Sequence, residues 1–77
     1  MNFAEEAFEQ LFPEKEKKFL LSAKFSGKFN DYNANIRMFN NNIRVNLSKK
    51  WRKVNKEITI GLIQSLLLRL FKEMQQT

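Results

Sequence analysis

The longest apolar pattern in the chain, residues 55–75, repeats with the period of an α-helix. At about 100° per residue, Gly61 and the polar residues, Thr59 among them, take most of one side. One broad arc on the other side holds seven apolar residues: Ile60, Ile63, Leu66, Leu67, Leu70, Phe71 and Met74. Asn55 is placed to cap this helix, because its side-chain oxygen accepts from a free backbone N–H of the first turn. We expect this helix to seal the core.

A second, shorter helix is predicted near the start of the chain. Apolar residues recur there at helical spacing, at Phe3, Ala4, Ala7, Phe8, Leu11 and Phe12. Asn2 is a suitable N-cap, and Pro13 disfavours helical geometry at the residue before it. A helix of about ten residues is too short to be stable alone, so we expect it to dock on the rest of the protein.

Between the helices the pattern changes to a period of two, which is typical of half-buried strands. A first strand is predicted where Phe19, Leu21, Ala23 and Phe25 alternate with polar or outward residues. A connection rich in turn-forming residues, SGKFNDYN, follows. Two further strands have inward faces at Ala34, Ile36 and Met38 and at Ile43, Val45 and Leu47. The asparagines at 40–42 tolerate the left-handed geometry of a tight turn, so these two strands are predicted to form a hairpin.

These elements predict one α+β domain over residues 1–77, in the order α-β-β-β-α. We expect a three-stranded antiparallel meander with both helices packed on one face. Trp51 and Val54, in the segment after Ser48, are expected to fix the angle at which the long helix returns over the sheet. Gly61 costs about 1 kcal/mol relative to alanine in a helix interior, and a close approach of another backbone would explain its presence.

Three apolar residues of the long helix lie off its main arc: Ile58, Leu62 and Leu68. Two uses are open for them. They either contact the first helix through Phe8 or Phe12, or they form an interface with a partner.

Composition excludes several classes of chemistry. The chain contains no cysteine and no histidine, which removes disulfides, zinc-finger ligands, thiol nucleophiles and imidazole bases. The serines have no imidazole to activate them, and the only glycines, Gly27 and Gly61, form no phosphate-binding loop. No signal peptide or membrane-spanning run is visible. We therefore expect a cytosolic protein that is not an enzyme and has no cofactor or metal.

The net charge of +6 is unevenly distributed. Residues through Glu16 hold five acids against Lys15 alone. Residues 17–56 hold eleven Lys or Arg against Asp31 alone, a net charge of +10. A field of one sign attracts polyanions or anionic surfaces, although a solvated basic face without a ligand gives the same pattern.

Basic residues on the outward strand positions and in the segment after the last strand are the candidate nucleic-acid site. Lysine and arginine alternating with asparagine can neutralise phosphates and hydrogen-bond to sugars or base edges. The candidates are Lys24, Lys28, Arg37, Arg44, Lys49, Lys50, Arg52 and Lys53. Exposed aromatic side chains could stack on bases, namely Phe29, Tyr32, Phe39 and Trp51, although Phe39 and Trp51 could instead close the ends of the core.

Two family resemblances follow from these features. The element order, with Ser48, Lys49, Lys50 and Lys53 ahead of the last helix, resembles a double-stranded-RNA-binding domain, in which comparable residues straddle phosphates. This chain departs from that family in its final helix, which is rich in Leu and Ile rather than Ala, and it lacks the Gly-containing lead-in to the lysines.

The second resemblance covers residues 35–71, NIRMFNNNIRVNLSKKWRKVNKEITIGLIQSLLLRLF, which are similar to the leading part of archaeal SprT-like, zincin-related proteins. In such zincins a hairpin precedes a helix that carries HExxH, whose histidines bind zinc and whose glutamate acts as base. Residues 64–68, QSLLL, stand at the corresponding positions and hold neither ligand nor base. The resemblance implies an accessory or degenerate unit without protease activity, and an association with DNA–protein complexes.

Two functional hypotheses emerge from the sequence. The first is a non-catalytic module that binds nucleic acid through the basic sheet face and the basic turn. The second is a protein-interaction or accessory domain beside a partner or a neighbouring domain, with contacts through Ile58, Leu62 and Leu68. The sequence does not choose between DNA, RNA and protein as the ligand, and it leaves open the oligomeric state and whether the chain is a fragment of a larger protein.

Overall fold

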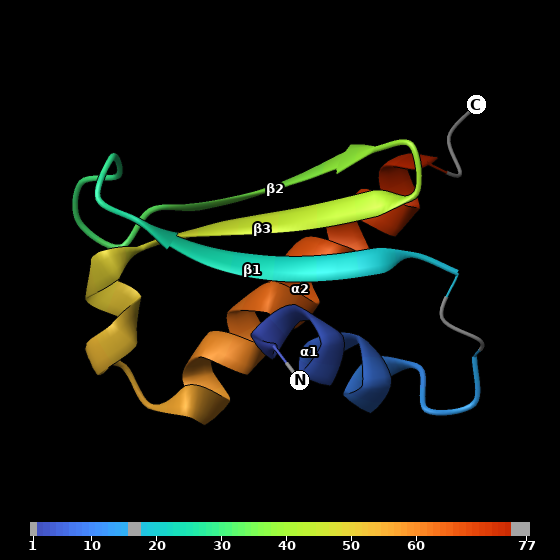
Figure 1. Ribbon diagram of the computed structural model, residues 1–77. Helices are drawn as coiled ribbons and strands as arrows, with labels where there is room; N and C mark the ends of the chain where they lie inside the picture. Colours follow the sequence, from blue (N-terminus) through green and yellow to red (C-terminus); the bar gives the residue numbers. More distant parts are fainter. Residues whose placement is uncertain (1, 16–17, 75–77) are drawn as a thin grey trace.

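Two helices lie on one face of a three-stranded sheet in the computed structural model, which describes residues 2–15 and 18–74 (Figure 1). The elements follow the expected α-β-β-β-α order, with a 3₁₀ helix added before the last helix. They are α1 (Phe3–Leu11), β1 (Leu20–Ser26), β2 (Ala34–Phe39), β3 (Asn42–Ser48), η1 (Lys49–Lys53) and α2 (Lys56–Met74). Glu16, Lys17 and Gln75, which entered the charge and helix predictions, lie outside the described residues.

The predicted antiparallel meander is wrong, because the strands are ordered β1-β3-β2 and the sheet is mixed. β3 lies in the centre, parallel to β1 and antiparallel to β2. The alternating pattern of a strand indicates which side chains face the core. It does not indicate which strand is its neighbour, so the strand order could not be obtained from it.

The loop between β1 and β2 allows β3 to occupy the centre. Two strand spacings separate the outer strands, about 9.5 Å, and a loop must cover at least that distance. Residues 27–33 are long enough to do so. β3 has fully buried inward side chains at Ile43, Val45 and Leu47, and the central position gives the backbone of this most buried strand a hydrogen-bonding partner on both sides.

The β2–β3 hairpin is confirmed. Phe39 pairs with Asn42 across a two-residue connection, and Asn40 has a φ of 56°. Asparagine adopts this left-handed geometry more easily than most residues because its short polar side chain can hydrogen-bond locally. The asparagine run therefore fixes the register in which β2 meets β3.

Both predicted N-caps are also confirmed. The Asn2 side chain accepts from the backbone N–H of Glu5 at 2.9 Å and donates to the carbonyl of Leu21 at 2.8 Å, so it both caps α1 and ties it to β1. The Asn55 side chain accepts from the N–H of Glu57 at 2.8 Å at the start of α2. As expected from Pro13, α1 ends at Leu11.

The core lies between the helix pair and the sheet. Its buried apolar residues come from all parts of the fold except β2 and η1, and they are Ala4, Ala7, Phe8, Leu21, Ile43, Val45, Leu47, Ile60, Ile63, Leu66 and Leu67. The inward residues of β2, Ala34, Ile36 and Met38, are partly buried and pack against this cluster. Phe19, predicted to open the first strand, precedes β1 and packs its ring against Phe71, with 5.7 Å between ring centroids.

Three positions of α2 differ from the helical-wheel prediction. Thr59, assigned to the polar side, is completely buried, and its Oγ1 has no hydrogen-bond partner. Met74, assigned to the buried arc, is exposed because the last turn of α2 reaches the end of the sheet. Gly61 is exposed and a Cβ there would meet nothing within 4 Å, so no close backbone approach explains this glycine.

No helix within residues 2–15 and 18–74 has the length and apolar character needed to cross a lipid bilayer. The same described residues contain no group of three or more acidic, histidine or cysteine side chains that could hold a metal ion.

Candidate nucleic-acid interface

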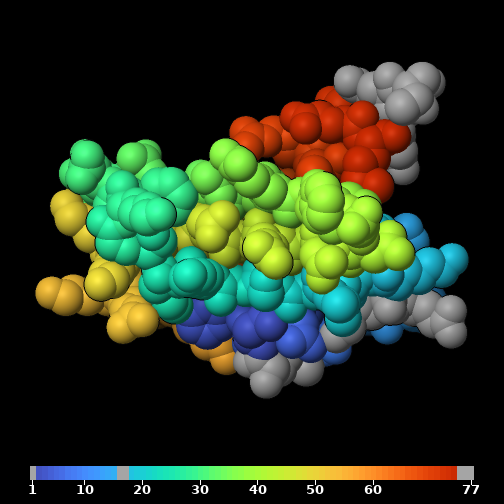
Figure 2. All heavy atoms as spheres, turned by 45° about the horizontal axis from the view of Figure 1, so that its top comes forward, coloured from blue at the N-terminus to red at the C-terminus, as the bar shows by residue number. Residues whose placement is uncertain are grey.

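The sheet face opposite the helices is uncovered by any other described element (Figure 2). Pairing across the strands arranges its side chains in three rows. From one end of the sheet to the other, the rows are Leu20–Asn42–Phe39, Ser22–Arg44–Arg37 and Lys24–Asn46–Asn35. We call these nine residues the outward face. It contains three cations, three asparagines, one serine and two large apolar side chains.

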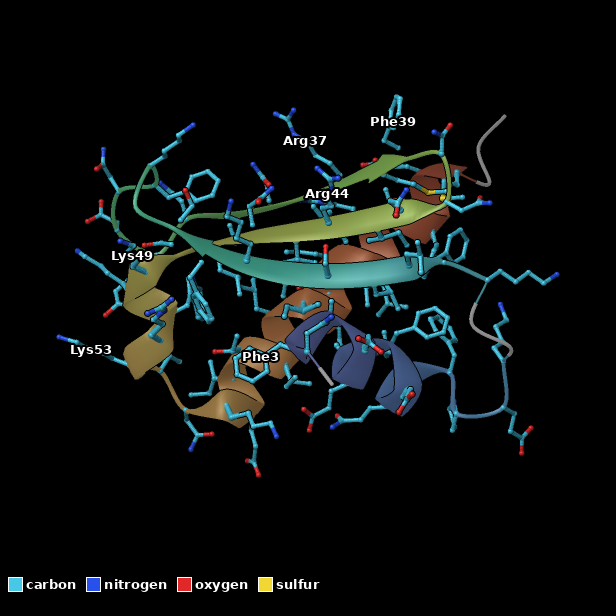
Figure 3. All side chains as sticks on the ribbon, in the orientation of Figure 1. Phe3, Arg37, Phe39, Arg44, Lys49 and Lys53 are labelled. Atoms are coloured by element: carbon cyan, nitrogen blue, oxygen red, sulfur yellow. The ribbon has the colours of Figure 1, made fainter. Side chains whose placement is uncertain are left out.

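Arg37 and Arg44 are directly opposite each other on the antiparallel strands β2 and β3. Both side chains are exposed and point away from the helices (Figure 3). Directly opposite residues on one face have Cβ atoms about 4.5–5.5 Å apart, and like charges at that distance destabilise a sheet. The fold therefore places two positive charges together at some cost to its own stability.

No described carboxylate forms a salt bridge with these arginines. The described acidic residues all lie outside the strands, and the salt bridges among them involve Lys50 and Lys56 instead. Lys24, on the next row, is likewise exposed and unpaired within the described part of the chain. The outward face thus has a positive potential that nothing in the described structure neutralises.

The remaining outward residues give the face one polar end and one apolar end. The Asn46 side chain donates to Oδ1 of Asn35 at 3.0 Å, which links the two amides across β2 and β3. At the opposite end, Phe39 is 77% exposed and Leu20 is 70% exposed. Phe39 points outward beside Arg37 (Figure 3), so the alternative in which it closes the end of the core is wrong, and its ring is exposed for stacking.

The other predicted cations gather at the opposite end of the sheet. Lys49, Lys50, Arg52 and Lys53 belong to η1, which turns down from the sheet toward the helix layer (Figures 1 and 3). Lys28 lies in the loop between β1 and β2. These five residues form a second basic group, which we call the basic end. Ser48 holds η1 in place, since its buried side chain accepts from the N–H of Lys50 at 3.2 Å.

Two cations of the basic end are already engaged within the protein. Lys50 Nζ is 3.4 Å from Oδ1 of Asp31. The guanidinium of Arg52 lies 5.0 Å from the centre of the Phe25 ring, a distance typical of a cation–π contact. Lys28, Lys49 and Lys53 are exposed and have no ion pair among the described residues, so they are the members of this group with free charge.

The three candidate stacking residues near the basic end differ in how far their rings are exposed. Trp51 is partly buried against the core, as in the alternative that it closes one end of the core, and its Nε1 donates to the carbonyl of Tyr32 at 3.0 Å. Tyr32 is exposed and meets Trp51 edge to face, with 5.6 Å between ring centroids. Phe29 is partly buried. Of the four candidate stacking residues, Phe39 and Tyr32 are exposed.

The candidate partner interface on α2 does not form one surface. Leu62 packs against the core, whereas Ile58 and Leu68 are 60% and 51% exposed. The prediction that these residues contact the core is therefore confirmed for Leu62 and wrong for Ile58. Ten residues separate Ile58 from Leu68, which is about 15 Å along the helix, and the helical period turns them to different faces.

Leu68 instead lines a groove of about 810 Å³, which we call the end groove. It lies where α1 ends, where the chain enters β1 and where α2 finishes. Its lining comprises Phe8, Phe12, Lys15, Lys18, Phe19, Leu68, Phe71, Lys72 and Met74. Sequence reasoning did not identify this groove, because its lysines are spread over separate segments and no motif links them.

Comparisons with protein-family models, with curated proteins and with solved structures find no match to this chain. The resemblances to SprT-like proteins and to double-stranded-RNA-binding domains therefore stay predictions.

Proposed function

We propose that this domain is a non-catalytic nucleic-acid-binding module and that the outward face is its main contact surface. The observation that carries the proposal is the Arg37–Arg44 pair, in which two exposed arginines oppose each other without a counter-charge from any described residue. A pair of this kind costs stability in the free protein. A phosphate placed between the two groups would remove that repulsion and form charge-assisted hydrogen bonds with both.

The arrangement of the neighbouring residues supports the same ligand. Lys24 adds a third cation one row further along the face, about 7 Å away along the strand direction. Asn35 and Asn46 offer amide groups in the row of Lys24, next to the two arginines, and these amides can hydrogen-bond to sugars or base edges. The exposed ring of Phe39 offers a stacking surface at the other end.

The basic end serves as a secondary contact in this proposal. It lies beyond the row of Lys24 rather than on the outward face, so a nucleic acid must extend past the end of the sheet to reach Lys28, Lys49 and Lys53. A ligand of a few nucleotides would use the outward face alone, while a longer one would engage both groups. Binding should therefore tighten with polymer length until both groups are covered. The cytosolic location expected from the sequence belongs to the same proposal.

The test is a binding titration against single-stranded DNA, duplex DNA and duplex RNA at several salt concentrations. Each neutralised phosphate should contribute a slope of about −0.9 for duplex DNA, or about −0.7 for single strands, in log K against log salt. Contacts from Arg37, Arg44 and Lys24 predict an absolute slope of about 2–3 on short polymers. Preference for one polymer would identify the ligand class.

A matched pair of variants separates site binding from general attraction. Arg44→Glu and Arg69→Glu make the same charge change at exposed positions, but Arg69 lies on α2, in the layer behind the sheet. Arg44→Glu should reduce affinity at least tenfold and lower the slope, while Arg69→Glu should have a small effect. Equal losses in the two variants, or no binding by the unmodified protein at low salt, would refute the proposal.

The second candidate function, a protein-interaction or accessory domain, is favoured by the exposure of Leu68 beside the end groove. The two functions respond to different substitutions. Arg37→Glu combined with Arg44→Glu should abolish nucleic-acid binding and leave partner binding intact, whereas Leu68→Lys should have the opposite effect. A Leu68→Lys protein that keeps every partner contact would remove this candidate.

A further inference from the structure

The end groove combines an aromatic floor with a cationic rim. Its floor is a cluster of four phenylalanines from three separate segments, with ring centroids 5.2–6.2 Å apart for the contacting pairs Phe8–Phe12, Phe8–Phe71, Phe12–Phe71 and Phe19–Phe71. Three of these rings, Phe12, Phe19 and Phe71, are only partly buried. The cluster therefore presents aromatic surface to the groove as well as to the core.

Every charged residue that lines the groove within residues 2–15 and 18–74 is positive. Lys15 and Lys18 come from the connection between α1 and β1, and Lys72 comes from the last turn of α2. Lys15 Nζ lies 5.1 Å from the centre of the Phe12 ring, so this ammonium group stays over the groove's aromatic wall. None of the described lining residues is acidic. A ligand with an apolar body and a negative head would match both parts of this surface.

The dimensions of the groove favour a small ligand over a protein surface. Its volume of about 810 Å³ is within the range of small-molecule sites, about 300–1,000 Å³. A stable protein interface needs about 800 Å² from each partner, and the exposed apolar residues of α2 do not continue from Leu68 toward Ile58. On α2, the exposed apolar surface at this end of the molecule is therefore limited to the groove, while Leu20 and Phe39 expose further apolar side chains on the outward face.

We propose that the end groove binds one monomeric long-chain carboxylate, of the fatty-acid class. The alkyl chain lies against Phe12, Phe71 and Leu68, and the carboxylate lies at the rim among the ammonium groups of Lys15, Lys18 and Lys72. This site is separate from the outward face, since its residues belong to the helix layer and to the α1–β1 connection. It does not depend on whether the outward face binds nucleic acid.

The test is a calorimetric titration of the whole chain with laurate below its micelle-forming concentration, with dodecyltrimethylammonium as an alkyl ligand of opposite charge. Laurate should bind saturably at one site, and the cationic ligand should bind at least tenfold more weakly. Amide NMR shifts on laurate addition should concentrate at the groove residues. Absence of saturable laurate binding, or shifts confined to other surfaces, would overturn the proposal.

Variants of exposed residues test the two parts of the site without unfolding the protein. Lys72→Gln and Lys18→Gln should each weaken laurate binding about two- to five-fold, the range expected of one exposed ion pair. Arg69→Gln is the matched control on the same helix, outside the groove, and it should leave binding unchanged. Leu68→Gln should weaken binding of laurate by removing apolar wall.

Two further results would contradict the proposed role of the lysine rim. If Arg69→Gln weakens laurate binding as much as Lys72→Gln does, the rim has no specific role and the proposal fails. It also fails if the protein binds vesicles of anionic phospholipid but not monomeric laurate, because the groove would then belong to a membrane-contacting surface.

Discussion

The Arg37–Arg44 pair leads to a prediction in which stability and binding change in opposite directions. Arg44→Glu replaces a like-charge pair with an opposite-charge pair at directly paired positions of β2 and β3. Cross-strand pairs of this kind are worth roughly 0.2–1 kcal/mol in either direction. Removing the repulsion and adding an attraction should raise the free energy of unfolding by about 1 kcal/mol, because on its other side the introduced carboxylate would face only the neutral Ser22.

For a domain of this length, about 1 kcal/mol corresponds to a rise in Tm of about 4–8 °C. The assay is thermal and urea denaturation followed by circular dichroism at low salt. In 1 M salt the Debye length shortens to about 3 Å, less than the separation of the pair, so most of the gain should disappear. Under the same low-salt conditions, the affinity of this variant for nucleic acid should fall.

A double-mutant cycle completes this prediction. Arg37→Glu alone should stabilise the protein by a similar amount, while the combination with Arg44→Glu restores a like-charge pair and should return the stability toward that of the starting protein. The coupling energy between the two positions should then be about 2 kcal/mol or less. Additive effects of the two substitutions, or a loss of stability in Arg44→Glu, would show that the two charges do not interact. The Arg37–Arg44 repulsion could then no longer be used to argue for a ligand.

Three further predictions concern α2. Gly61→Ala should raise the free energy of unfolding by about 1 kcal/mol, since a Cβ there meets no atom within 4 Å; a loss of stability in urea denaturation would contradict the open surroundings of Gly61. Thr59→Val should raise the free energy of unfolding by roughly 1 kcal/mol, because it replaces a buried hydroxyl that has no hydrogen-bond partner. An unchanged or lower Tm would show that the hydroxyl is hydrogen-bonded in the folded protein. Leu68→Lys, at an exposed position, should change the free energy of unfolding by less than about 1 kcal/mol. Leu67→Lys, at the fully buried neighbouring position, should abolish cooperative unfolding. Comparable losses of stability in the two variants would show that the buried face of α2 is assigned wrongly.

The sequence determined the elements and much of the inward face of the protein. Periodicity located both helices and all three strands, and Asn2, Asn55 and Pro13 marked helix ends through interactions with their immediate neighbours. The asparagine turn fixed the β2–β3 register for the same reason. Alternation along the strands likewise placed Arg37 and Arg44 opposite the core, because successive side chains of a strand point to opposite faces.

The tertiary structure alone decided how these elements were placed relative to one another. The insertion of β3 between β1 and β2 depends on pairing between distant segments, and an alternating pattern contains no information about neighbours. The burial of Thr59 depends on what packs over the start of α2 rather than on its position on a helical wheel. The end groove exists because Lys15, Lys18 and Lys72 meet over a cluster of phenylalanines, and only the docking of α1 on α2 brings those segments together.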